Sequence, residues 1–165
     1  MNRYSTYLMF GVMVIALLIS NAARLHGQER GPQNKAVVLM SGNWKGVWVS
    51  LSKESSGYLF FADLQMKVAD NQSVTGKIVW ILKKAPPNSP LINKIGFSSV
   101  EFVKGKFYPE SNTLVLNGYK KEDPRVIIAL DEYRLILSDD HKVLGGITAS
   151  HRTWKGLISL DLKKK

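Results

Sequence analysis

The chain has 165 residues, carries a formal net charge of +10 at pH 7 and contains no cysteine. The lack of cysteine excludes disulfide bonds, thiol catalysis and a lipid anchor attached to a cysteine. A chain of this length can bury about two-thirds of its unfolded surface, so an apolar core can stabilise one domain without cross-links. The positive charge favours anionic partners. Its lysines are dispersed in pairs along the chain, whereas a nucleic-acid reader more often shows arginine-rich clusters interleaved with aromatic residues along one element, so we expect no specific nucleic-acid recognition.

Residues 1–22 have the pattern of a secretory signal peptide. Arg3 gives a positive start, residues 8–19 form an apolar run, and small residues follow around Ala22. This order predicts cleavage after Ala22. A membrane-spanning helix needs about 20 apolar residues, so we expect the segment to be removed rather than kept as an anchor. The sequence therefore predicts a secreted or periplasmic protein with no transmembrane segment after cleavage.

Residues 23–41 contain glycine, proline and mixed charges without a sustained period, and we expect a flexible lead-in. A short first strand at residues 36–40 is an option at its end. From residue 42 to residue 165 the dominant period of the apolar residues is two, interrupted by turn residues. This pattern predicts a single domain of antiparallel strands.

The strand candidates can be taken in chain order, and the second is the clearest. There, Phe60, Leu64 and Met66 share one face and should be buried. Prolines between residues 83 and 90 predict a long loop, with a short helix at residues 90–95 as an option. The alternation slips near Gly105, which suggests a bulge. The candidates are residues 44–51, 58–68, 74–82, 98–108, 113–119, 126–130, 133–137, 143–147 and 154–162.

These elements form an antiparallel meander of about eight or nine strands with hairpin-length connections. Such a meander tends to close, because closure removes the exposed edges. We therefore predict an all-β fold that is a closed or nearly closed barrel. A β-sandwich is the alternative.

The triplet Gly42-Asn43-Trp44 resembles the Gly–x–Trp that opens the first strand of calycin-type barrels, the lipocalins and avidins. The resemblance implies a meander barrel with a ligand pocket at its mouth. It also implies that Trp44 closes the barrel floor beneath a basic side chain from the last strands. Arg152 or Lys155 could supply that side chain.

No catalytic signature is present. The sequence has no Gly–x–Ser–x–Gly, no dense zinc-ligand spacing and no phosphate-binding glycine loop before a helix. The run Asp139-Asp140-His141 lies between two strand candidates, where such residues favour a turn. Asp63 and Glu101 are the mid-strand carboxylates with strongly apolar neighbours, and we expect both to face solvent. The prediction is a protein that is not an enzyme and has no metal or cofactor.

Aromatic residues in or beside the strands are the more informative set. On inward strand faces of a barrel they can line a ligand pocket. We therefore predict a binding protein that holds a small or apolar ligand in the barrel interior. The alternative is a filled barrel whose basic surface docks on an anionic envelope component or a protein partner. The candidate ligand-binding residues are Trp48, Tyr58, Phe60, Trp80, Tyr119 and Tyr133.

Overall fold

The computed structural model describes residues 40–51, 57–150 and 155–163, and these form a closed barrel of eight antiparallel strands in sequential order. The fold is therefore an all-β meander barrel rather than a sandwich. The predicted signal segment and nearly all of the lead-in lie outside the described residues. The strands are β1 (Gly42–Ser50), β2 (Leu59–Val68), β3 (Ser73–Lys84), β4 (Ser98–Tyr108), β5 (Thr113–Glu122), β6 (Asp131–Leu137), β7 (Val143–Ser150) and β8 (Lys155–Lys163).

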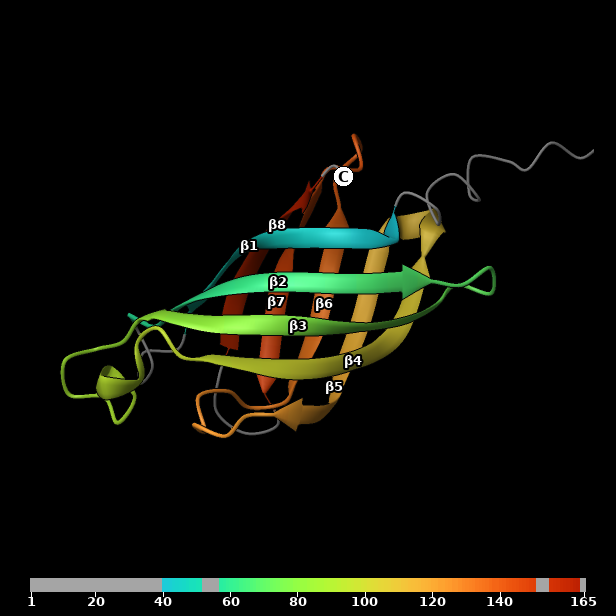
Figure 1. The fold of residues 1–165 in the computed structure, drawn as a ribbon. Coiled ribbons are helices and arrows are strands. Elements are labelled where there is room, and N and C mark those ends of the chain that lie inside the picture. The colour runs from blue at the N-terminus through green and yellow to red at the C-terminus, as the bar shows by residue number, and fades with distance from the viewer. Residues whose placement is uncertain (1–39, 52–56, 151–154, 164–165) are drawn as a thin grey trace, which may run out of the picture. The chain divides into compact units, whose positions relative to one another are not determined.

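The barrel closes through pairing of β1 with β8, so that every strand has two neighbours. In Figure 1, β1 to β4 run across the front and β5 to β8 run steeply across them behind. Among the helices of the described segments, none is long and apolar enough to cross a membrane.

The period-two alternation places the apolar faces inside the barrel. On β2, Phe60, Leu64 and Met66 are buried, as the sequence predicts, while Phe61 and Lys67 are exposed on the opposite face. Successive side chains of a strand point to opposite faces, so each strand contributes one row to a continuous core.

One strand candidate is wrong. Residues 126–130 form no strand and instead belong to the irregular connection between β5 and β6. The Asp123 carboxylate accepts hydrogen bonds from the backbone amides of Ile127, at 2.9 Å, and Ile128, at 3.0 Å. Val126 also has a φ of 53°. The amides that a strand would direct to a neighbouring strand are therefore used by a side chain.

The two ends of the barrel differ. Short turns at residues 69–72, 109–112 and 138–142 join strands at one end, and the longer connections 85–97 and 123–130 lie at the other. The optional helix at residues 90–95 is a 3₁₀ helix, η2 (Ile92–Lys94), within the first of these connections. Figure 1 shows this connection projecting from the barrel. We call the end of the barrel that carries the connections 85–97 and 123–130 the long-loop end.

Candidate functional site

A pocket of about 30 Å³ lies at the long-loop end of the barrel. This volume holds one or two water molecules. Its wall combines aromatic rings from the first three strands, two carboxyl groups and part of the β5–β6 connection. The lining residues are Trp48, Phe60, Trp80, Glu101, Ile127, Ile128, Ala129 and Asp131.

The aromatic part of the wall is a row of three rings across adjacent strands. Trp48 and Phe60 are direct partners in the β1–β2 register, and their ring centroids are 5.6 Å apart in an edge-to-face arrangement. Phe60 and Trp80 meet in the same way at 6.1 Å. Such pairs add about 0.5–1.5 kcal/mol each beyond the burial of their surface, so the contacts between the rings stabilise this wall.

Glu101 points into the barrel, and our expectation that it faces solvent is wrong. Its exposed fraction is 1 %. The carboxylate accepts hydrogen bonds from Trp80 Nε1 at 3.1 Å, from the Asp131 backbone amide at 2.9 Å and from the Tyr133 hydroxyl. Burial raises the pKa of Glu101, although these hydrogen bonds oppose the rise.

Gly118 on β5 explains why a carboxylate fits there. A Cβ atom at this position would lie 1.9 Å from Glu101 Oε1. The β4–β5 register also shifts between Phe102 and Val103, next to Glu101, rather than near Gly105 where the sequence suggested a bulge. The irregularity therefore accompanies the burial of a charged side chain, as bulges near functional sites often do.

Asp131 is the second carboxyl group of the pocket. Burial and the nearby charge of Glu101 raise the pKa of Asp131 to about 7, and a hydrogen bond with Thr148 opposes the rise. Thr148 is itself buried and accepts a hydrogen bond of 2.7 Å from Trp48 Nε1. Because Glu101 receives three donors, it carries the negative charge first, and Asp131 keeps a proton until the pH is near neutral.

The hydroxyl of Tyr133 stays protonated in this network. Burial raises the pKa of Tyr133 well above its usual value, and the charges of Glu101 and Asp131 act in the same direction. The hydroxyl is therefore a permanent donor to Glu101. Residues from β1, β3, β4, β6 and β7 thus meet in one polar network beside the pocket.

The β5–β6 connection is held over the pocket by Asp123. Besides its two backbone bonds, this carboxylate accepts a hydrogen bond from the Ser99 hydroxyl and one of 3.2 Å from Lys121 Nζ. Lys121 Nζ also donates to the Ile128 carbonyl. These contacts fix residues 127–129, which form the loop side of the pocket wall.

The structure brings together four of the six predicted ligand-binding residues. Trp48, Phe60 and Trp80 line the pocket, and the Tyr133 hydroxyl donates a hydrogen bond to Glu101, which also lines it. Tyr58 is buried and hydrogen-bonds to Ser89 instead.

Tyr119 lies apart from this group, since 52 % of it is exposed and Lys104 Nζ lies 5.2 Å from its ring centroid. Trp44 is fully buried towards the short-turn end and donates to the Met40 carbonyl at 3.1 Å. Arg152, the predicted partner of Trp44 in closing the barrel, lies outside the described residues.

Asp140 in the β6–β7 turn stabilises the turn itself. Asp140 accepts hydrogen bonds from the Ser138 hydroxyl and the Lys142 amide, as the turn interpretation predicts. Within the described part of the chain, no group of three or more His, Asp or Glu residues could hold a metal ion.

Sequence reasoning missed Asp131 and Thr148 as site residues, and it placed Glu101 on the wrong face. Of these three residues, only Glu101 has a feature in the sequence that could have indicated burial, because its neighbours on the strand are apolar.

Comparison of the chain with protein-family models, with curated proteins and with solved structures found no match.

Proposed function

We propose that the protein binds a small ligand in the pocket at the long-loop end and does not alter it chemically. The observation that carries the proposal is an aromatic wall with two convergent carboxyl groups in one pocket. Ligand sites commonly combine apolar walls with a few well-placed polar groups that fix orientation. Because the volume of the pocket is about 30 Å³, only the head of the ligand fits inside, and the rest extends outwards.

The proposal also treats the chain as a calycin-like barrel. The eight-stranded closed meander, the buried Trp44 near the start of β1 and the pocket at the long-loop end support this interpretation. Since a shared fold does not determine a ligand, the site itself must supply the chemistry.

The indole N–H groups of Trp48 and Trp80 provide the test, because both are donors in the polar network. Small molecules of different charge would be titrated into the ¹⁵N-labelled protein while the two indole signals are followed. We expect saturable shifts of these signals for at least one class. Phe60→Ala should abolish them, whereas Phe61→Ala, on the outer face of the same strand, should not. Shifts confined to residues away from the pocket would contradict the proposal.

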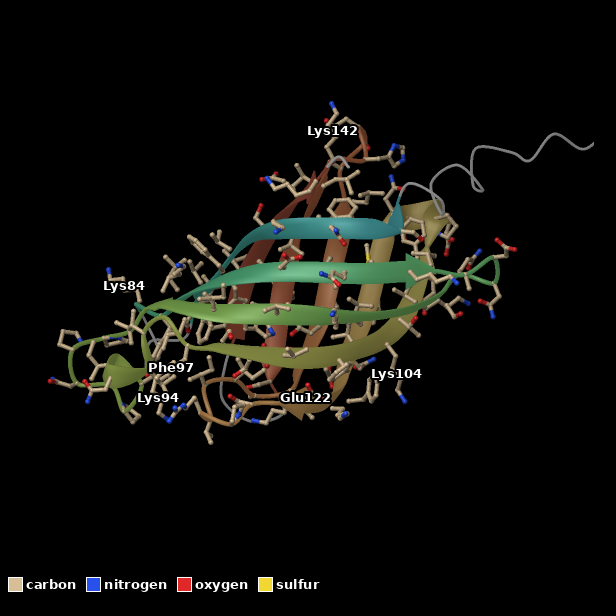
Figure 2. The ribbon with its side chains drawn as sticks, in the orientation of Figure 1. Lys84, Lys94, Phe97, Lys104, Glu122 and Lys142 are labelled. Atoms are coloured by element: carbon tan, nitrogen blue, oxygen red, sulfur yellow. The ribbon has the colours of Figure 1, made fainter. Side chains whose placement is uncertain are left out.

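A second candidate function uses the outer surface. On β4 and β5, three lysines lie over aromatic rings: Lys104 over Tyr119 at 5.2 Å, Lys106 over Tyr108 at 5.3 Å and Lys120 over Phe102 at 4.8 Å. We call these six residues the lysine–aromatic face. Figure 2 shows Lys104 pointing away from the barrel. Such a face suits an anionic envelope component or an acidic partner.

A further inference from the structure

We infer that the pocket recognises a protonated alkylamine, whose ammonium group lies beside Glu101 and Asp131 and whose first carbons contact the aromatic wall. This inference rests on the proposed function and names the ligand class of the same site.

The first argument is uncompensated charge. Glu101 is fully buried, and its three hydrogen-bond partners are all neutral groups. Among the described side chains, those of residues 40–51, 57–150 and 156–163, no basic group forms an ion pair with Glu101 or Asp131. Lys121 acts on Glu101 only through the longer-range Coulomb interaction, because its ammonium group binds Asp123 and the Ile128 carbonyl. A buried carboxylate without a cation is costly, so a cationic ligand would be strongly favoured.

The second argument is the chemistry of the wall. Rings of tryptophan and phenylalanine attract cations through their negative faces, with tryptophan the strongest. The indole N–H groups of Trp48 and Trp80 are already bound to Thr148 and Glu101. Trp48, Phe60 and Trp80 therefore line the pocket with aromatic and apolar surface rather than with further hydrogen-bond donors. An anionic ligand would meet two carboxyl groups, and a neutral one would leave Glu101 without an ion-pair partner among the described side chains.

The third argument is size. A pocket of about 30 Å³ takes an ammonium group with little more than its first carbon. It cannot enclose a lipid tail or an aromatic ring, for which a cavity of about 150 Å³ is typical. The polar network therefore meets the charged head of the ligand.

The site also makes the binding depend on pH. The groups that face Asp131 are Glu101 from β4, Tyr133 from β6 and Thr148 from β7, with Lys121 on β5 further away. An ammonium ion favours the ionised form of Asp131. Since the pKa of Asp131 is about 7, about one-tenth of the free protein is ionised there at pH 6 and about nine-tenths at pH 8. The affinity should therefore fall about tenfold from pH 8 to pH 6, with release of about one proton per cation bound at pH 6.

The experiment uses the full chain and three four-carbon probes: n-butylammonium, n-butanol and butyrate, at matched ionic strength. Binding is followed by the indole ¹⁵N–¹H signals of Trp48 and Trp80, and proton release by calorimetry in buffers of different ionisation enthalpy. We expect saturable binding of n-butylammonium, binding of n-butanol at least tenfold weaker, and none of butyrate.

Two variants and one control localise the effect. Glu101→Gln should abolish binding of n-butylammonium. Asp131→Asn should weaken it at pH 8 by about tenfold and remove the proton release, and this variant remains informative if Glu101→Gln fails to fold. Asp161→Asn, with the same change in charge on the exposed face of β8, should leave both unchanged.

The outcomes separate the two proposals. If n-butanol or butyrate shifts the indole signals as strongly as n-butylammonium, the pocket binds ligands but the inference of an amine is overturned. The inference also fails if Asp131→Asn binds n-butylammonium as the wild type does. If no probe shifts either indole signal, the amine inference fails, and the proposed function fails with it if the wider titration is also negative.

Discussion

Two carboxyl groups share one buried network in this barrel, and their different surroundings divide the charge between them. Glu101 accepts three hydrogen bonds, whereas the carboxyl group of Asp131 has one hydrogen-bond partner among the described residues, Thr148. Such a pair, with one charged and one protonated member near neutral pH, is typical of binding and catalytic sites. The same arrangement must make the stability of the fold depend on pH.

Asp131→Asn should remove part of that dependence. The pKa of Asp131 is about 7 in the folded protein and near 3.8 in the unfolded chain. Between these values the unfolded state binds fewer protons, so the contribution of Asp131 to stability is complete below about pH 4 and is lost as the pH rises to about 7. The free energy of unfolding of Asp131→Asn relative to the wild type should therefore rise from pH 4 to pH 7. Urea denaturation at several pH values measures it, and a difference that stays constant with pH would contradict the assigned shift.

Gly118→Ala tests the space that Glu101 occupies. The added Cβ would lie 1.9 Å from Glu101 Oε1 and 3.2 Å from the Asp131 backbone nitrogen, so the carboxylate must move. We expect a loss of about 1–3 kcal/mol in the free energy of unfolding, as for other overpacked sites. Gly145→Ala is the control, because its Cβ would meet no atom closer than 4.0 Å. Equal effects of the two changes would show that the Glu101 site is not the cause.

At the scale of the element, β2 shows how one strand supplies both core and pocket. Its inward row begins with Phe60 in the aromatic wall and continues with Leu64 and Met66 in the core. The pairing of β2 with β1 and β3 fixes this row in register with Trp48 and Trp80. Packing in the barrel centre therefore sets the geometry of the pocket wall.

Leu64→Ala measures that packing. Leu64 is fully buried, so its truncation should lower the free energy of unfolding by about 2–5 kcal/mol. The exposed Lys67→Ala on the same strand should change it by less than about 0.5 kcal/mol. Thermal or urea denaturation of the two variants gives the comparison. A loss for Leu64→Ala as small as the control would place the wrong face of β2 inward.

At the scale of the whole molecule, the chain is basic, with a formal net charge of +10, whereas the pocket is lined by two carboxyl groups. Ligand binding in the pocket would therefore depend on negative carboxyl groups inside the barrel, and docking on the lysine–aromatic face would depend on positive lysines outside it. Ionic strength distinguishes them, because exposed charges are screened beyond about 10 Å at 0.1 M salt whereas buried ones are screened much less.

Binding of a sulfated polysaccharide should weaken steeply with salt if the lysine–aromatic face is the binding device. Replacing Lys104, Lys106 and Lys120 by Gln should then weaken binding more than the same replacement of Lys84, Lys94 and Lys142. Figure 2 shows Lys84, Lys94 and Lys142 away from Lys104. Titration at 50 mM and 500 mM salt measures both effects. Equal losses in the two triple variants would indicate a response to total charge and would argue against a docking face.

The sequence alone predicted eight of the strands and an antiparallel meander that is closed or nearly closed, with a β-sandwich as the alternative, because alternation and turn chemistry are local properties of the chain. Residues 126–130 were mistaken for a strand, since their apolar run does not reveal that Asp123 binds its amides. The aromatic part of the site was also predicted from the sequence, because Trp48, Phe60 and Trp80 lie on the inward-facing rows of their strands. The pair of carboxyl groups could not be predicted from the sequence. Glu101 can point inward because Gly118 on the neighbouring strand leaves space for it, and the pKa of Asp131 depends on Glu101 and on burial. The register of the paired strands β4, β5, β6 and β7 brings these groups together and decides which carboxylate carries the charge, and closure of the barrel through β1 and β8 adds the contact of Trp48 with Thr148.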